Sequence, residues 1–504
     1  ALPLSLRRQR QMCIRDRTEE GSIWSIIFVA VPAIFLLQLL LSAYVWRKIN
    51  KRKRRQYGNQ VGLALLVCFI LTHLVNSWAD ATLYQPITMQ RANFPLSYPM
   101  TARSFLAKHG WLDLEQYEKK AEDQGSAEHR LLYPLRPLSV SAPSDHKNLL
   151  VVVVDSLRAD MLNNINMPNL QRYADNHFNF RQHMSGGNDE AMGMFSLFYG
   201  LPGHYYGDIR ADKRPPVLFD EMLRQDYQFG LFGALEDAKQ YRQSLLAGLR
   251  KQVFVSRQTD DRRLIDDWQQ WLGTRTADRP WFSLVYLSSP GDYQVPASIK
   301  GPFQPELTRF NPATAYRPEN LQKLENRYKN AVFYTDQLLE QMLTQLQLQG
   351  LDDQTIVVIT SNHGQEFNET QSNSWGYGSN YSTYQVQVPL VLAWPGAEPA
   401  PQAQASSHLD LVPTLMKNML GVRNPYRDYS TGRNLFEAST RTWLLAGDQN
   451  DFAIYQGNTI TQFNKQGDFE LLDRDTYRPI KHGTPDMGTL IQVMNELNRF
   501  YRAP

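Results

Sequence analysis

The chain has 504 residues, of which 42% are hydrophobic and 12% aromatic, which excludes an intrinsically disordered protein and leaves ample material for a folded core. At about 100–200 residues per domain, this length predicts two to four domains. The two cysteines, Cys13 and Cys68, both lie near the N-terminus. The rest of the chain is therefore free of disulfides and has neither a cysteine metal ligand nor a catalytic cysteine.

The net charge of +3 is the sum of two parts of opposite sign. Residues 1–57 contain twelve Lys and Arg against three Asp and Glu, a net charge of +9, whereas the remainder contains 41 against 47, a net charge of −6. Nonspecific binding to nucleic acid depends on basic side chains that neutralise phosphates, so the acidic body argues against a nucleic-acid partner. The basic end requires another explanation.

Two uncharged segments near the N-terminus predict membrane-spanning helices. Residues 23–46 are mostly apolar and exceed the roughly 20 residues that a bilayer-spanning helix needs. A second uncharged stretch, 56–79, has its apolar part at 61–78. It carries His73 and Asn76, which we expect to face protein rather than lipid.

The segment between these spans, RKINKRKRRQ (47–56), has seven basic residues in ten. A solvated charge run or a nucleic-acid patch would have this composition, but a short basic loop between two spans is better explained by the positive-inside rule. The loop is then cytoplasmic, and the large domain after residue 80 is extracytoplasmic. In a Gram-negative cell that compartment is the periplasm.

Residues 1–20 do not fit this topology, because their five arginines would keep the N-terminus in the cytoplasm. We interpret them as an unassigned leader, with residues 1–17 foreign to the protein, and exclude them from the fold. Residues 21–80 are then two helices that remain from a larger membrane domain.

Residues 81–147 are predicted to be a juxtamembrane segment and linker rich in proline and aromatic residues. From composition alone an ordinary linker is the favoured interpretation. The alternative is a lipid-headgroup site, in which arginines pair with phosphates while aromatic and methionine side chains enter the acyl boundary. Its candidate residues are Tyr84, Met89, Arg91, Phe94, Tyr98 and Arg103.

From Asn148 onward, short apolar β-branched runs alternate with helical patterns, which predicts an α/β domain (148–424) with a mostly parallel sheet and helices on both faces. The predicted strands are 148–155, 227–233, 281–287, 355–361 and 388–394. The predicted helices are 165–177, 191–199, 216–225, 260–272, 318–349 and 409–420. Residues 425–504 are predicted to form a small antiparallel extension followed by a helix at about 486–502.

Candidate site residues follow the predicted strands, where open α/β sheets place their sites. Asp155 ends the first strand, Asn362 and His363 end another, and His408 precedes a helix. A Gly-rich loop enters a helix within 183–200, where backbone N–H groups could hold an anion. Each feature alone has a structural explanation as a cap or a turn. Together they favour a metal or anion site.

These residues resemble the alkaline phosphatase/sulfatase superfamily, whose members share a first-strand Asp, a nucleophile (Ser, Thr or a modified Cys) that opens a helix, and a TSDHGE-type strand end. The matching segments, over about residues 148–420, are VVVVDSLRADM, HMSGGNDEAMGMFSLFYG, VVITSNHGQEFNE, VPLVLAWPG and SHLDLVPTL. The hairpin together with YQPITMQRANFPLSYPMTARSFLAKHG resembles more narrowly the YejM (PbgA) family. These are Gram-negative inner-membrane proteins with an N-terminal membrane domain and a periplasmic sulfatase-like domain.

Two of the four key positions depart from the superfamily pattern. The nucleophile position falls at Asp189 or Glu190, which have neither hydroxyl nor thiol, and Asn362 replaces the Asp of the metal-binding Asp-His pair. No residue is therefore predicted to be catalytic, and Ser156 and Ser185 are the nearest alternative nucleophiles. The resemblance implies at most a weak or vestigial site for Mg, Mn, Zn or Ca, made of Asp155, Asp189, Asn362 and His363.

The resemblance implies a multi-pass protein of the bacterial inner membrane with its C-terminal domain in the periplasm. It implies a non-catalytic protein that binds lipopolysaccharide (lipid A) or cardiolipin and restrains a LapB–FtsH type of proteolytic system that controls lipopolysaccharide synthesis, which favours the lipid-headgroup site. The alternative is a metal-dependent hydrolase of sulfatase or phosphatase type, or a phospho-group transferase, that acts on lipid headgroups. A purely structural envelope protein is a third hypothesis.

Overall fold

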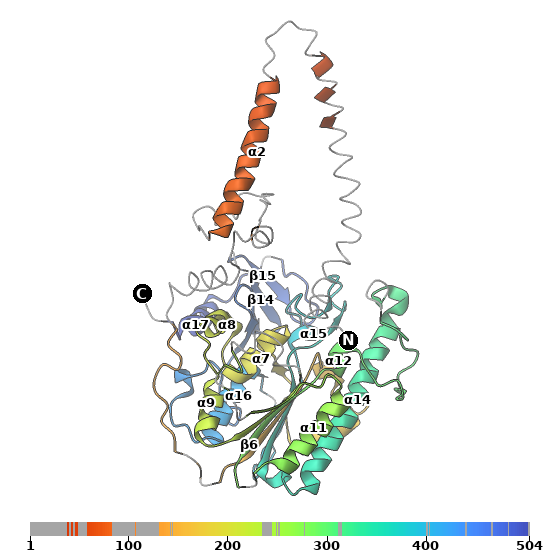
Figure 1. The fold of residues 1–504 in the computed structure, drawn as a ribbon, viewed down its shortest axis with the longest axis vertical. Helices are drawn as coiled ribbons and strands as arrows, with labels where there is room; N and C mark the ends of the chain where they lie inside the picture. Colours follow the sequence, from red (N-terminus) through yellow and green to blue (C-terminus); the bar gives the residue numbers. More distant parts are fainter. Residues whose placement is uncertain are drawn as a thin grey trace. The chain divides into compact units, whose positions relative to one another are not determined.

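A computed structural model describes residues 131–501, apart from short gaps, together with residues 58–82 and a few helical residues at 38–39, 42–43, 46–48 and 106. The gaps are 142, 144, 234–243, 248, 250–252, 277, 311–314, 400–401, 403, 439–440, 465–466 and 482. The chain divides into two compact units, one of residues 1–130 with Pro504 and the other Leu131–Ala503. Both are drawn in Figure 1.

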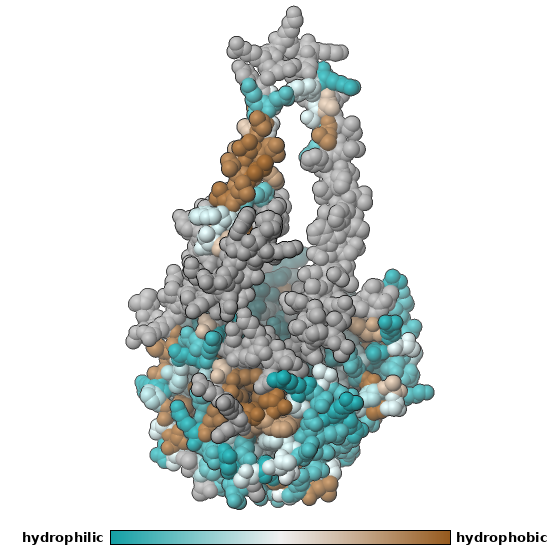
Figure 2. All heavy atoms as spheres, viewed as in Figure 1, coloured by the Kyte–Doolittle hydropathy of each residue, from teal (hydrophilic) through white to brown (hydrophobic). Residues whose placement is uncertain are grey.

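The first unit contains helix α2 (Gly58–Ala81), which coincides with the second predicted span. Its apolar side chains are exposed around the helix, among them Leu65 and Phe69, and Figure 2 shows this hydrophobic surface. Among the described helices, α2 is the one long and apolar enough to cross a membrane. Asn76 is buried, in agreement with the expectation that this polar residue faces protein. Most of the first predicted span, 23–46, lies outside the described residues.

The second unit is built on a seven-stranded sheet in the order β2-β10-β7-β1-β6-β4-β5. The bounds of its strands are β1 (Asn148–Val154), β2 (Phe178–Asn179), β4 (Gln228–Phe232), β5 (Val253–Ser256), β6 (Trp281–Leu287), β7 (Thr355–Ser361) and β10 (Leu390–Ala393). Strands β7, β1, β6, β4 and β5 pair in parallel, while β10 runs in the opposite direction and pairs antiparallel with both β7 and β2. The predicted fold class is confirmed.

The central strands β1, β6 and β7 are buried along their whole length, which explains their continuous apolar runs. The five predicted strands begin and end within two residues of the observed ones. Strands β2 and β5 were not predicted. They are short edge strands, and β5 leaves Phe254 exposed, so neither carries the pattern of a buried strand.

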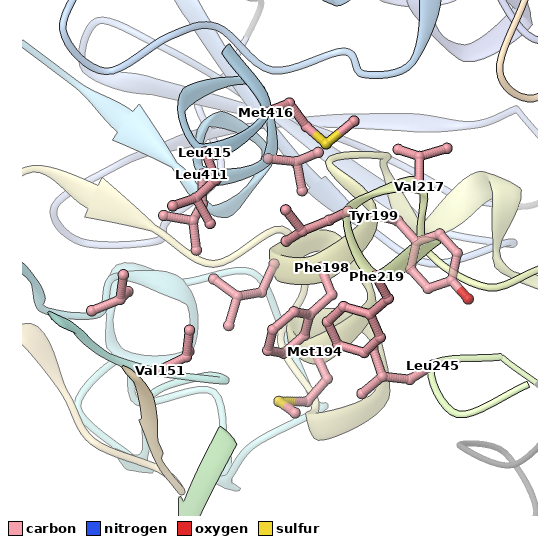
Figure 3. Packing of buried hydrophobic residues seen from close by; sticks show 14 of the residues in the cluster. Val151, Met194, Phe198, Tyr199, Val217, Phe219, Leu245, Leu411, Leu415 and Met416 are labelled. Carbon is pink, nitrogen blue, oxygen red and sulfur yellow. The ribbon is translucent and has the colours of Figure 1, made fainter. Parts of the chain in front are cut away.

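Helices cover both faces of the sheet, because successive side chains of β1 point to opposite sides. Leu150, Val152 and Val154 pack with α6 (Pro168–Asp175), α11 (Asp261–Thr274) and α14 (Leu321–Leu348). Leu149, Val151 and Val153 belong to the other core, with α7 (Glu190–Tyr199), α9 (Val217–Arg224) and α16 (Leu411–Asn418). Figure 3 shows the second core, in which the rings of Phe198 and Phe219 lie side by side and Leu411 and Leu415 of α16 face the same interior.

The C-terminal part is an antiparallel meander followed by a helix, as predicted. Its elements are β12 (Trp443–Gly447), β13 (Phe452–Gln456), β14 (Thr459–Phe463), β15 (Phe469–Asp473) and α17 (Met487–Asn498). The smaller elements of the unit are β3 (His183–Met184), α8 (Tyr206–Ala211), α12 (Ser289–Asp292), β8 (Glu366–Phe367), β9 (Trp375–Gly376), α15 (Thr383–Val386) and β11 (Ser406–Ser407). Residues 131–147, which we assigned to the linker, belong to this unit, since Leu131 pairs with Tyr501 and Val140 with Val422.

A buried carboxylate joins two of the covering helices. Asp336 of α14 accepts the backbone N–H groups of Asn169 (3.0 Å) and Leu170 (2.8 Å) in the first turn of α6. It thereby supplies a cap that the residue preceding α6 does not provide. Burial raises the pKa of Asp336 to about 6, against the opposing effect of the two N–H donors. Because the folded protein favours the protonated form of Asp336, the free energy of unfolding is highest below the ordinary pKa of an aspartate. This added stability is lost as the pH rises through about 6.

We expect Asp336→Asn to flatten the pH dependence of folding stability. Between pH 4.5 and 7.5, ionisation of Asp336 should lower the free energy of unfolding of the wild type by about 2 kcal/mol, and the variant should lack this decrease. Urea unfolding of both proteins at the two pH values measures the difference. Asp353→Asn, at an exposed acidic residue just after α14, is the control and should behave as wild type. An unchanged pH dependence in the Asp336 variant would contradict this assignment.

Candidate functional site at the ends of β1 and β7

Two neighbouring parallel strands bring the candidate residues together. Val154 and Ser361 are paired in register, so Asp155 and Asn362 follow at the same edge of the sheet. Tyr286, near the end of β6 on the other side of β1, also reaches this point. The site is therefore built where three central strands end.

Asn362 is fully buried and its side-chain amide is held on both sides. Its Oδ1 accepts the backbone N–H groups of Ser156 (3.2 Å) and His363 (2.8 Å). Backbone N–H groups can only donate, so these contacts determine which end of the amide is the oxygen. Nδ2 accordingly donates to Asp155 Oδ1 (2.9 Å) and to the Tyr286 hydroxyl (3.0 Å).

His363 lies beside the same carboxylate. Its Nδ1 donates to the carbonyl oxygen of Gly364 (2.8 Å), and its ring lies against Tyr377 with 4.0 Å between the ring centroids. Nε2 is buried 3.4 Å from Asp155 Oδ1 and has no hydrogen-bond partner among the described residues. Because Nδ1 holds a proton, Nε2 carries one only in the imidazolium form, which would make an ion pair with Asp155.

The expected nucleophile position is a helix cap in this chain. Asp189 is the N-cap of α7, and its Oδ1 accepts the backbone N–H of Met192 (2.8 Å). Burial raises the pKa of Asp189, while the Met192 N–H and the nearby His363 act in the opposite direction. Glu190, the first residue of α7, is buried. Neither carboxylate supplies the hydroxyl or thiol that the superfamily uses.

The two alternative serines are both fully buried. Ser185 Oγ donates to the carbonyl oxygen of Asn362 (2.6 Å) and accepts the N–H of Gly187 (3.3 Å). Ser156 has a left-handed backbone with φ of 61°, and its hydroxyl lies 3.5 Å from Asp155 Oδ1. Without rearrangement, neither hydroxyl is accessible to a substrate.

Two glycines allow backbone to close around the site. A Cβ at Gly193 of α7 would lie 1.9 Å from the carbonyl oxygen of Asn362, and a Cβ at Gly291 of α12 would lie 2.3 Å from Asp155 Oδ2. Neither these glycines nor Tyr286 and Tyr377 were predicted from the sequence to be site residues. A glycine inside a predicted helix and a tyrosine near the end of a central strand were the available signals.

His408, the other candidate at a helix start, makes different contacts. Its Nδ1 lies 3.2 Å from the carbonyl oxygen of Gly193, and Nε2 lies 3.3 Å from Thr360 Oγ1. Burial lowers the pKa of His408 to about 3, so its ring is neutral at physiological pH. His408 supports the packing of α7 against β7 and is not among the contacts of Asp155.

This donor set does not fit a sulfatase-type dication. A cation bound by Asp155 and residue 362 needs oxygen lone pairs from both, but Asn362 turns its oxygen to the backbone and its N–H groups to Asp155. In this orientation Asn362 offers no oxygen to a cation beside Asp155, and the predicted weak metal site stays a prediction. In the part of the chain that the structure describes, no three His, Cys, Asp or Glu side chains are grouped so as to hold a metal ion.

The six lipid-site candidates, Tyr84, Met89, Arg91, Phe94, Tyr98 and Arg103, lie outside the described residues. Their assignment stays a prediction.

Comparison with known proteins identifies the family. A sulfatase family model matches residues 147–422, and a domain of unknown function, DUF3413, matches residues 5–140. The inner membrane protein YejM of Salmonella typhi is 32% identical over 491 residues, which cover 96% of this chain and 78% of that protein. The chain belongs to the YejM family of sulfatase-fold proteins. An uncharacterized protein of Haemophilus influenzae is 33% identical over 96% of this chain and 77% of its own length.

Solved structures show the same sulfatase-like α/β fold at lower identity. An alkaline phosphatase superfamily protein of Vibrio parahaemolyticus has a TM-score of 0.53 at 16% identity, and the match covers 74% of this chain and 93% of that one. A phosphonate monoester hydrolase of Agrobacterium radiobacter has a TM-score of 0.53 at 15% identity and covers 70% and 95%. These likenesses show the fold alone. The YejM relatives, the sulfatase family model and helix α2 together describe a membrane-associated sulfatase-like protein.

Proposed function

We propose that this chain is a multi-pass inner-membrane protein that binds an envelope lipid through its juxtamembrane segment. Its sulfatase-fold domain lies in the periplasm and catalyses no sulfate or phosphate transfer. The observation that carries the non-catalytic part is the orientation of Asn362. Its amide hydrogens point at Asp155, where the superfamily resemblance implies a carboxylate pair and a cation.

The other parts of the site support the same proposal. Group transfer in this superfamily needs an activated oxygen or sulfur nucleophile near the cation. Asp189 caps α7 instead, and the hydroxyls of Ser156 and Ser185 are buried. Close backbone approach at Gly193 and Gly291 leaves little room beside Asp155 and Asn362. The site is better suited to holding β1, β6 and β7 together than to binding a substrate.

The proposed topology is supported by the basic segment 47–56 and by the apolar helix α2 that follows it. The positive-inside rule puts the basic loop in the cytoplasm, so the chain after α2 enters the periplasm. The Salmonella relative is named an inner membrane protein, which agrees with this location.

The proposed ligand is lipopolysaccharide, through lipid A, with cardiolipin as a further candidate lipid. Binding would be coupled to regulation of lipopolysaccharide synthesis through a membrane partner of the LapB–FtsH type. This part rests on the resemblance and on the arginines and aromatic residues of 84–103. Guanidinium groups suit the phosphates of lipid A because they donate two parallel hydrogen bonds.

We expect the double variant Arg91→Ala, Arg103→Ala to bind lipid A at least about tenfold more weakly than wild type, because charge-assisted hydrogen bonds to phosphate are worth about 1.5–3 kcal/mol each. Binding of labelled lipid A to the full chain in detergent measures the change. The control replaces two exposed arginines of the globular unit, Arg181→Ala and Arg263→Ala, and should bind normally. Undiminished binding by the first variant would refute the assignment.

A metal-dependent hydrolase of lipid headgroups is the second candidate. The observation in its favour is the buried Nε2 of His363, which lies beside Asp155 without another partner among the described residues. Metal analysis of the full chain, together with phosphatase and sulfatase assays, separates the two proposals. Bound zinc or manganese with turnover that Asp155→Ala abolishes would replace the non-catalytic proposal.

A further inference from the structure

We infer that α17 and an arginine-lined hollow at its C-terminal end form a surface that contacts an anionic bilayer. This inference deepens the lipid-binding part of the proposed function with residues of the globular unit. It does not depend on the candidates at 84–103, so the two can be tested separately.

Helix α17 is apolar on two sides. Thr489, Val493 and Leu497 are buried against the meander, as expected for a surface helix. A second row, formed by Met487, Ile491 and Met494, is 60%, 59% and 43% exposed. These residues follow the i, i+4, i+7 spacing that places side chains in one line along a helix. A row of large exposed apolar side chains on one helix indicates a surface that binds another protein or a membrane.

A positively charged hollow lies at the end of this helix. Its lining includes four arginines, Arg427, Arg433, Arg441 and Arg499, and one acidic residue, Glu496. Tyr426 and Trp443 also line the hollow, and both residue types are enriched where proteins meet the membrane–water interface. The chain after residue 57 is net acidic, so this local excess of guanidinium groups is a specific feature of the surface.

Hydrogen bonds and ion pairs with acidic side chains orient three of these arginines. Arg441 makes two hydrogen bonds to the buried Asp410, at 2.9 and 2.5 Å. Arg427 lies 3.3 Å from Glu496, which also pairs with Arg499. The side chain of Arg427 is 66% exposed, so it is the arginine best placed to meet a phosphate outside the hollow.

The first residues of the globular unit pair with the same surface. Leu131 pairs with Tyr501, and the N–H of Leu132 donates to the carbonyl oxygen of Phe500 (2.8 Å), just after α17. The N–H of Leu135 donates to the carbonyl oxygen of Asp428 (2.8 Å), next to Arg427. Residues 131–135, which begin the globular unit, therefore lie between the end of α17 and the segment that carries Arg427.

The position of α17 leaves its apolar row on the outside of the unit. It lies beside α8 (Figure 1), where the hydroxyl of Tyr205 donates to the carbonyl oxygen of Glu496 (2.8 Å). A second copy of the chain would also cover the apolar row, but it would leave the exposed guanidinium group of Arg427 without an anionic partner on a matching apolar surface. An anionic bilayer satisfies both the apolar row and the arginines.

The experiment uses the full chain with Cys13→Ser and Cys68→Ser in lipid nanodiscs. A polarity-sensitive fluorophore on Met494→Cys or Ile491→Cys should shift to shorter wavelength and be quenched by brominated acyl chains when the discs contain phosphatidylglycerol. The same label on Leu348→Cys or Ile165→Cys, which are 77% and 71% exposed elsewhere on the unit, should show neither effect.

The role of charge is tested with matched arginines. Arg427→Gln should lower the ratio of bilayer-bound to free surface roughly fivefold, the effect of one arginine near an anionic membrane. Arg224→Gln is the control, because this side chain is also 66% exposed and also pairs with a glutamate. Equal effects of the two substitutions would overturn the role of the hollow.

Other outcomes overturn the inference as a whole. No shift in phosphatidylglycerol discs would exclude bilayer contact by α17, and a shift that depends on protein concentration rather than on lipid would assign the surface to a second copy. Equal shifts in phosphatidylcholine discs would exclude recognition of anionic headgroups. Since lipid A binding through Arg91 and Arg103 is measured independently, failure here leaves that proposal intact.

Discussion

Replacing Asn362 by aspartate is expected to create a site for a divalent cation at the ends of β1 and β7. One oxygen of the new carboxylate would keep the backbone N–H groups of Ser156 and His363, which now donate to Oδ1. The other would replace Nδ2 next to Asp155 Oδ1, now 2.9 Å away. Two facing carboxylates beside His363 Nε2 repel each other unless a cation lies between them.

The expected stability change has opposite signs with and without metal. In EDTA, Asn362→Asp should be about 2–4 kcal/mol less stable than wild type, because it adds a buried like charge and removes two hydrogen bonds. Saturating Mn²⁺ should restore about 2.7 kcal/mol at a hundred times the dissociation constant. Wild type should show no such rise. Thermal unfolding of the full chain in detergent, with and without Mn²⁺, measures both effects.

A reciprocal exchange is the control for this experiment. Asp155→Asn combined with Asn362→Asp keeps one carboxylate and one amide at the same two positions, so it should not gain metal affinity. Mn²⁺ stabilisation of wild type equal to that of Asn362→Asp would contradict the interpretation of the amide. It would also favour the hydrolase candidate.

A second large effect is expected at Gly193. Gly193→Ala should destabilise the globular unit by about 3 kcal/mol or more, because the added Cβ would lie 1.9 Å from the carbonyl oxygen of Asn362. The clashing atom belongs to the backbone that follows β7, so α7 and the sheet would have to separate. Urea unfolding followed by tryptophan fluorescence measures the loss.

Gly273→Ala is the matched control for Gly193→Ala. Gly273 is also helical, in α11, but a Cβ there meets nothing within 4 Å. This substitution should be neutral or stabilise by up to about 1 kcal/mol, since alanine favours the helix. Similar losses at both glycines would show that helix propensity, and not the contact with Asn362, explains the effect.

Much of the fold could be predicted from local patterns. Strands buried on both faces must be apolar throughout, so β1, β6 and β7 were visible as continuous runs. Helix α2 was visible because a bilayer requires a long uncharged segment. Strands β2 and β5 escaped prediction because their pairing partners, and not their own residues, define them as strands.

At the candidate site, the sequence predicted the residue types but not their contacts. The residue types at 155, 189, 362 and 363 were sufficient to question catalysis, because a carboxylate cannot replace a hydroxyl nucleophile and an amide removes a negative ligand. They did not show that the Asn362 amide faces Asp155, that Ser185 is buried, or that Gly193 packs on the end of β7. These contacts join residues far apart in the chain.

The sequence by itself determined the apolar helix α2, the α/β class and the altered positions of the sulfatase pattern. Each depends on residue type and spacing within a short segment. The tertiary structure decided the strand order, the orientation of the Asn362 amide and the pairing of Leu131 with Tyr501 just after α17. The physical reason is that hydrogen-bond partners and exposed faces are set by non-local packing, which no single segment specifies.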